Sequence, residues 1–157
     1  MPTSPVPSIW QELARTPLRY GFVDAAGTRT RYLEAGDGDP LVLLHGTGGH
    51  LEAYARNIAP LAEHFRVIAY DMLGHGYSDH PDIPYTVDVL ADHLVAFLDA
   101  MGLDRPIVSG ESLGGWVTAW AAAHHPTRVR GAILNTPGNI AARPEVMRKL
   151  RESSIKR

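Results

Sequence analysis

The sequence predicts an α/β fold built on a doubly wound, mostly parallel β-sheet, and three observations support this class. From residue 40 onward, strand-like segments alternate with helical ones, which is typical of parallel βαβ units. Residues 41–44 form a continuous apolar run, as in strands that are buried on both faces. Two alternating segments, 18–23 and 28–34, precede this run and predict an antiparallel hairpin that extends the sheet.

The remaining elements follow from local patterns along the chain. Residues 8–14 predict a short helix, and residues 51–62 are weakly helical. The segment 86–101 is the clearest helix, because its apolar residues recur at helical spacing, Thr86 is placed to cap it and Gly102 lies at its end. The other predicted elements are strands at 65–70, 106–110 and 129–135 and helices at 112–125 and 144–151.

The most informative motif is G-x-S-x-G at residues 110–114, between a predicted strand and a predicted helix. In that setting the motif is typical of a nucleophile elbow, a sharp turn that exposes a serine hydroxyl. The flanking glycines have a steric reason, because a Cβ atom at either position would crowd the turn. A helix N-cap is the alternative interpretation of Ser112, but a cap needs neither glycine. The motif therefore favours Ser112 as a candidate catalytic nucleophile.

A glycine-rich loop at residues 45–49, with the sequence HGTGG, follows the apolar run directly. Backbone N–H groups of such a loop, together with that of the residue after a nucleophile, form an oxyanion hole. We expect Thr47 and Leu113 to supply the donors, with Gly48 beside them at the binding site. His45 belongs to the same loop, and we expect its ring to brace the loop through hydrogen bonds. A plain glycine turn is the alternative, and the serine motif downstream argues against it.

A third motif, D-x-x-G-x-G-x-S-D at residues 71–79, follows the predicted strand 65–70. The three motifs, in this order, resemble the α/β-hydrolase superfamily, and they are most similar to the branch of meta-cleavage-product (carbon–carbon bond) hydrolases and related esterases. The resemblance covers nearly the whole chain from about Tyr20. It implies a serine hydrolase acting on an ester or on the C–C bond of a vinylogous diketone, without a cofactor. It also implies that Asp71 organises the turn that follows it. A serine acyltransferase remains open.

The resemblance further implies a larger domain, in which an acid and a histidine follow the serine along the chain. We therefore expect a sheet truncated after about its sixth strand, with the general base and its acid missing. Residues 1–140 are predicted to form the N-terminal part of the hydrolase core, and residues 141–157 the beginning of a helical lid. A truncated gene product, a fragment and one piece of a split protein all fit this expectation.

None of the eight histidines is predicted to be the general base. His75 lies in the glycine-rich turn after Asp71. The others outside the 45–49 loop are interpreted as helix-end, surface or helix residues: His50, His64, His80, His93, His124 and His125. Glu111 also lines the candidate site. It could contact a polar substrate or the lid, or it could be a structural salt-bridge partner, which is the reading we favour.

Composition argues against several other classes of protein. The net charge of −2 and the scattered basic residues give no nucleic-acid footprint, and no apolar run approaches the roughly 20 residues that span a bilayer. The absence of cysteine excludes disulfides and is consistent with a cytoplasmic location. No histidine spacing fits a zinc site, and no glycine pattern fits a nucleotide site. We expect a small-molecule substrate, and neither a metal nor a cofactor.

A second hypothesis is a catalytically inactive, hydrolase-like interaction module. If the sixth predicted strand is the last, Ala132, Ile133 and Leu134 form an unpaired apolar row at the edge of the sheet. Unpaired edges invite pairing with other chains, so this hypothesis predicts self-association through that edge.

Overall fold

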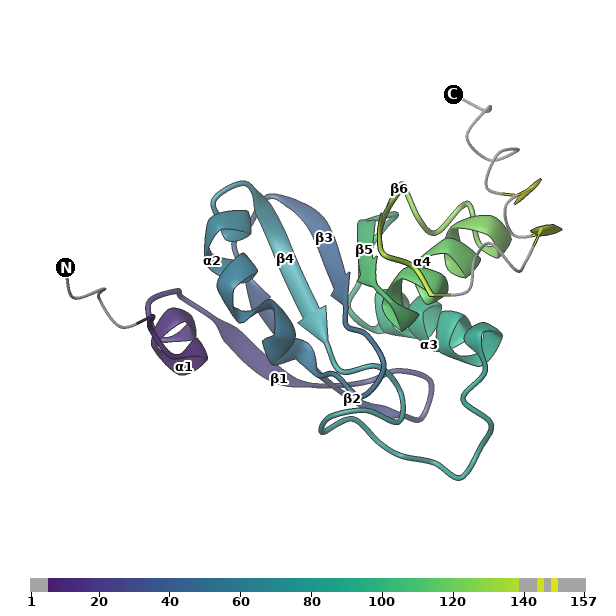
Figure 1. Ribbon diagram of the computed structural model, residues 1–157, viewed down its shortest axis with the longest axis horizontal. Helices are drawn as coiled ribbons and strands as arrows, with labels where there is room; N and C mark the ends of the chain where they lie inside the picture. The colour runs from purple at the N-terminus through teal and green to yellow at the C-terminus, as the bar shows by residue number, and fades with distance from the viewer. Residues whose placement is uncertain (1–5, 139–143, 146–147, 150–157) are drawn as a thin grey trace.

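The computed structural model describes residues 6–138, 144–145 and 148–149, and it contains a six-stranded sheet flanked by helices (Figure 1). The elements are α1 (Ile9–Leu13), β1 (Arg19–Asp24), β2 (Arg29–Ala35), β3 (Asp39–Leu44), η1 (Leu51–Tyr54, a 3₁₀-helix), α2 (Ala55–Ala62), β4 (Phe65–Tyr70), α3 (Val87–Ala100), β5 (Ile107–Glu111), α4 (Leu113–His124) and β6 (Gly131–Asn135). All the elements predicted within residues 8–135 are present, with shifts of one or two residues at most ends.

The strand order is β1-β2-β4-β3-β5-β6, and the arrangement confirms the predicted α/β class. Strands β4, β3, β5 and β6 run parallel to one another, whereas β1 pairs with β2 and β2 with β4 in antiparallel fashion. The predicted hairpin therefore extends the parallel sheet. Strand β3 lies at the centre, where Leu41 is in register with Val67 of β4 on one side and Ile107 of β5 on the other.

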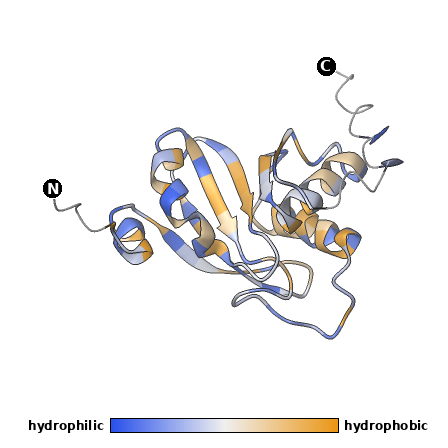
Figure 2. Cartoon of the chain, viewed as in Figure 1, coloured by the Kyte–Doolittle hydropathy of each residue, from blue (hydrophilic) through white to orange (hydrophobic). Residues whose placement is uncertain are grey.

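The apolar run of β3 is explained by a hydrophobic core on each face of the sheet. Leu41 and Leu43 pack into the core beneath α1 and α2, whereas Val42 and Leu44 pack into the core beneath α3 and α4. Because alternate residues of a strand point to opposite faces, both sets must be apolar when both faces are covered. Figure 2 shows the resulting hydrophobic colouring along the central strands.

The start of α3 corrects one detail of the prediction. Thr86 occupies the N-cap position, but its side chain makes no capping hydrogen bond to the helix backbone. Its hydroxyl instead bonds the carboxylate of Asp88 and thereby lowers the pKa of that side chain. The position of the cap was therefore predicted correctly, but the side-chain hydrogen bond that normally defines a threonine cap is absent.

Strand β6 forms one edge of the described sheet. Ala132 is exposed, Ile133 is 48% exposed and Leu134 is half-buried. The predicted lid segment 141–157 lies mostly outside the described residues, which include only 144–145 and 148–149 of it, both helical.

Candidate functional site

The strand order places the two glycine motifs side by side. The chain passes from β3 to β4, which pairs with one side of β3, and later returns to form β5, which pairs with the other side. The direction in which strands are added to the sheet therefore reverses at β3. Ligands of open α/β sheets bind at such a reversal, outside the carboxyl ends of the strands. The last β3–β5 pair is Leu44 with Gly110, so the 45–49 loop and the 110–114 turn leave the sheet as neighbours.

Gly46 shows how closely the 45–49 loop approaches the 110–114 turn. A Cβ atom on Gly46 would lie 2.3 Å from Oε2 of Glu111 and 3.2 Å from Cβ of Ser112. The Glu111 carboxylate is the far end of a flexible side chain and can move aside, but the distance to Cβ of Ser112 is tighter than most real Cβ contacts. The backbone of the loop therefore lies directly against the predicted nucleophile.

Ser112 has a strained backbone, with φ 51° and ψ −111°. Non-glycine residues at positive φ typically cost about 1–3 kcal/mol and persist only where the surroundings hold them. The end of β6 and the residues after it hold this one: the Ser112 N–H donates to Asn135 O at 3.0 Å, and Gly138 N–H donates to Ser112 O at 2.9 Å. Residues 136–138 thus fold back onto Ser112.

The flanking glycines are required by close backbone contacts. A Cβ atom on Gly110 would lie 2.1 Å from Gly114 O, and one on Gly114 would lie 2.3 Å from Leu44 O. These contacts confirm that side chains at either position would crowd the turn.

Ser112 occupies the N-cap position of α4, but its side chain makes no capping hydrogen bond to the helix. Ser8 offers the contrast, because its hydroxyl accepts from Gln11 N–H and completes a capping box at the start of α1. The Ser112 side chain is half-buried and has no hydrogen-bond partner among the described residues.

The two predicted donor amides lie outside the sheet ladders. Leu113 is the first residue of α4, so its N–H has no partner within the helix. Thr47 and Gly48 lie in the exposed part of the 45–49 loop, and Gly48 adopts φ 69° with open space around it. Neither the Thr47 nor the Leu113 amide donates a hydrogen bond to another described residue.

His45 braces the loop, as the sequence predicts. Its Nε2 accepts from Met72 N–H at 3.1 Å, so Nδ1 carries the proton and donates to Gly46 O at 2.8 Å. Burial lowers the pKa of the ring, which favours this neutral tautomer. Because both ring nitrogens are occupied, His45 is a structural residue in this arrangement.

Two other residues of this region were also singled out by the sequence. Glu111 is exposed at the end of β5 and forms no ion pair with the residues that the structure describes, so the favoured salt bridge stays a prediction. His93 lies on α3 as predicted, but it is buried and bonds Thr30 Oγ1 through Nε2 at 3.0 Å. Its burial depends on the β2 strand packing against α3, which helical spacing alone does not reveal.

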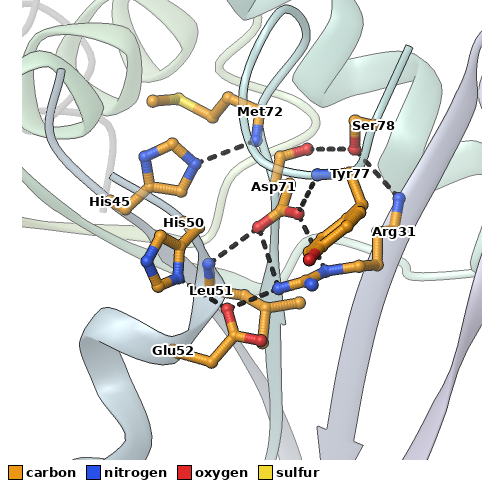
Figure 3. Close-up of polar contacts among 9 residues, drawn as sticks. All are labelled: Arg31, His45, His50, Leu51, Glu52, Asp71, Met72, Tyr77 and Ser78. Carbon is orange, nitrogen blue, oxygen red and sulfur yellow. Dashed lines mark hydrogen bonds and ion pairs between the residues drawn. The ribbon is translucent and has the colours of Figure 1, made fainter. Parts of the chain in front are cut away.

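A buried ionic cluster lies behind the 45–49 loop (Figure 3). The side chain of Asp71 is fully buried at the end of β4, and Oδ2 lies 2.8 Å from Nε of Arg31. Oδ1 accepts from Leu51 N–H at 2.7 Å, and Oδ2 accepts from Tyr77 N–H at 2.8 Å. Asp71 therefore organises the turn after β4, as the resemblance implies, and also anchors the segment that follows the 45–49 loop.

Glu52 completes this cluster from η1. It accepts from Nη2 of Arg31 at 2.5 Å and lies 2.6 Å from Nδ1 of His50. Burial opposes ionisation of Glu52, but hydrogen bonds from its own backbone amide, His50 and Arg31 outweigh that effect and lower its pKa. Sequence reasoning missed Arg31 and Glu52, because a charged residue in an alternating strand or a surface helix normally faces solvent.

The chain thus combines an α/β sheet with a serine on a strained strand-to-helix turn and a glycine-rich loop beside that turn. The family model described as "alpha/beta hydrolase fold" matches residues 39–153, and the chain belongs to that family. Among the described residues, no helix is long and apolar enough to cross a membrane. The same residues contain no group of three or more potential metal ligands.

Several of the relatives that the chain resembles carry the names of hydrolases. It is 44% identical over 117 residues to 2-hydroxy-6-oxo-6-(2'-aminophenyl)hexa-2,4-dienoic acid hydrolase of Metapseudomonas resinovorans, covering 72% of this chain and 40% of that protein. It is 45% identical over 114 residues to 2-hydroxymuconate semialdehyde hydrolase of Pseudomonas sp. strain CF600, covering 70% and 40%. The crystal structure of a serine hydrolase involved in carbazole degradation superposes with a TM-score of 0.72 at 41% identity, covering 78% and 49%. The chain thus spans about 40% of the length of these curated relatives.

Proposed function

We propose that the chain carries the nucleophile and the oxyanion hole of a serine hydrolase that acts on a small molecule. Ser112 attacks a carbonyl carbon, or assists attack on it when the scissile bond is a C–C bond. The Thr47 and Leu113 amides, with Gly48 beside them, receive the negative charge that develops on the carbonyl oxygen. The observation that carries this proposal is the strained backbone of Ser112, whose side chain makes no capping bond, together with the 45–49 loop that lies against the 110–114 turn.

The substrate class follows from the relatives. The names of the hydrolases from Metapseudomonas and Pseudomonas describe dienoic acid and semialdehyde substrates. We propose an ester or a vinylogous diketone C–C bond as the scissile group. Among the described residues no histidine bonds Ser112, and we propose that the general base and its acid are supplied by residues other than these histidines. We further propose that Glu111, which is exposed at the end of β5, meets a polar part of the substrate.

The first prediction concerns acylation of Ser112. We expect p-nitrophenyl acetate to leave an acetyl group on Ser112, detected by intact-mass and peptide mass spectrometry, because the proposed oxyanion donors stabilise the charge that forms when the hydroxyl attacks. Ser112→Ala should carry no such adduct and should release nitrophenol at least about tenfold more slowly, since removing a triad member leaves only the residual catalysis of the rest of the site. Ser8→Ala removes the same hydroxyl from a true helix cap and should behave as the wild type. Equal rates for Ser112→Ala and wild type would contradict the proposal.

The exposed edge of the sheet favours self-association as a second proposal. Strand β6 presents exposed Ala132 and Ile133 at the edge of the sheet. Leu134 of the same strand packs against a small hydrophobic cluster that includes Ala119 and Ala123. We propose that copies of the chain pair along this strand, because the edge has neither the charges nor the proline that normally block such pairing.

The second prediction tests this edge. The wild type should elute as a dimer or larger species in size-exclusion chromatography with light scattering, and Ile133→Lys should shift it toward the monomer, because a charge on an edge strand opposes pairing. Ile83→Lys is the matched control, since Ile83 is 42% exposed and Ile133 is 48% exposed. A monomeric wild type that melts cooperatively would refute self-association.

A further inference from the structure

Tyr54, which belongs to neither strand, lies at the carboxyl ends of β3 and β5. The ladder between these strands ends at the pair Leu44 and Gly110. Just beyond this pair, the hydroxyl of Tyr54, at the end of η1, donates a hydrogen bond to Leu44 O at 2.7 Å. Leu44 is fully buried, and the 45–49 loop begins at the next residue.

The surroundings of Tyr54 keep its hydroxyl in the donor form. Burial and, to a smaller extent, the negative charge of Glu111 raise the pKa of the phenol to about 12, although a hydrogen bond with the backbone of Glu111 acts in the opposite direction. The phenol therefore keeps its proton throughout the neutral range. These contacts also place Tyr54 beside both strands, because Glu111 is the last residue of β5 and Leu44 the last residue of β3.

The carbonyl that Tyr54 binds is also a contact point for the first turn of α4. A Cβ atom on Gly114 would lie 2.3 Å from Leu44 O and 2.6 Å from His45 O. The Leu44 carbonyl is thus held by the phenol and is in close contact with the helix that starts after Ser112. Movement of this carbonyl would change the distance between the 45–49 loop and Ser112.

We infer that Tyr54 is a positioning residue, whose hydroxyl fixes the start of the 45–49 loop relative to Ser112 and so sets the place of the Thr47 amide. This inference rests on the proposed function, since the amide matters for catalysis only if it receives an oxyanion. Tyr54 touches neither the substrate nor the reacting atoms in this role. It acts through the Leu44 carbonyl, so a phenylalanine, which keeps the ring and lacks the hydroxyl, removes the effect.

The third prediction compares Tyr54→Phe with Tyr85→Phe, because Tyr85 also donates to a backbone carbonyl, Pro81 O, at 2.6 Å. The amide hydrogen of Gly49, which donates to Gly46 O at 3.0 Å within the loop, should exchange at least about tenfold faster in Tyr54→Phe, followed by NMR, and at an unchanged rate in Tyr85→Phe. The urea unfolding midpoint should remain close to the wild type. An unchanged exchange rate at Gly49 would overturn the inference, and so would global unfolding of Tyr54→Phe, since a positioning role is local.

Phenylboronic acid separates this inference from the proposed function. Ser112 Oγ adds to the trigonal boron and its proton passes to solvent, so that a boron-bound oxygen occupies the oxyanion position. We expect Tyr54→Phe to bind phenylboronic acid about tenfold more weakly than the wild type and Tyr85→Phe to bind it equally well. If Tyr54→Phe binds as tightly as the wild type, the inference fails. If the wild type does not bind it, or Ser112→Ala binds it equally well, the proposed function fails, and the exchange rate of the Gly49 amide still decides the role of Tyr54.

Discussion

Arg31→Met should destabilise the protein by about 3–5 kcal/mol, the usual cost of removing one partner from a buried ion pair. The Arg31 side chain is 2% exposed, and its guanidinium is the cation between the carboxylates of Glu52 and Asp71. Methionine fills a similar volume but leaves the buried carboxylates of Glu52 and Asp71 without their cation. The Asp71 carboxylate also accepts hydrogen bonds from the backbone of Leu51 and Tyr77. Because small domains are stable by only about 5–15 kcal/mol, this one change removes a large part of the total.

The measurement is urea unfolding at neutral pH, with Arg130→Met as the matched control. Arg130 pairs with Asp39 at 2.8 Å, but both side chains are about half exposed or more, at 46% and 65%. Exposed pairs contribute about 0–1 kcal/mol, so the control should lose little. The double variant Arg31→Met, Glu52→Gln should be less destabilised than Arg31→Met alone, because one uncompensated charge is gone. Equal, small losses for Arg31→Met and Arg130→Met would show that the cluster does not stabilise the fold.

Acidification from about pH 6.5 to pH 4 should cost the wild type about 3 kcal/mol through His93 alone. Burial lowers the pKa of His93 from 6.5 to about 4, because the ring lies between Thr30 and Tyr70 with Nδ1 lacking a partner among the described residues. As the pH falls through 6.5, the unfolded chain takes up a proton at this ring and the folded protein does not. Proton binding therefore favours the unfolded state until the folded ring also titrates near pH 4.

The check is the free energy of unfolding measured by urea at several pH values between 7 and 4. His93→Gln cannot titrate, so it should lose less stability than the wild type over this range, and the difference between the two curves isolates His93. Other groups, including buried His45, contribute equally to both. His80→Gln removes the same ring from an exposed position and should keep the wild-type dependence. Parallel curves for His93→Gln and wild type would contradict the assigned cause.

Much of the candidate site could be predicted from local sequence, because its requirements are local. Gly110 and Gly114 are dictated by backbone atoms within a few residues of the turn or at the end of the neighbouring strand. The assignment of His45 as a brace also succeeded, since both its partners lie in motifs that the sequence displays. The partner of Glu111 could not be predicted in this way, because ion pairing depends on which distant cations come within reach, and no pattern in the sequence encodes that.

The order of the elements, the two-sided burial of β3 and the glycines around Ser112 were determined by the sequence alone, because periodicity and steric exclusion act over a few residues. Only the tertiary structure decided that Arg31 lies between Glu52 and Asp71, that His93 is buried, and that the Tyr54 hydroxyl joins the ends of β3 and β5. These features depend on residues that are 10 to 63 positions apart in the chain. The charge or hydroxyl of each side chain is visible in the sequence. Its burial and its partners are set by how the strands pair and how the helices pack against them.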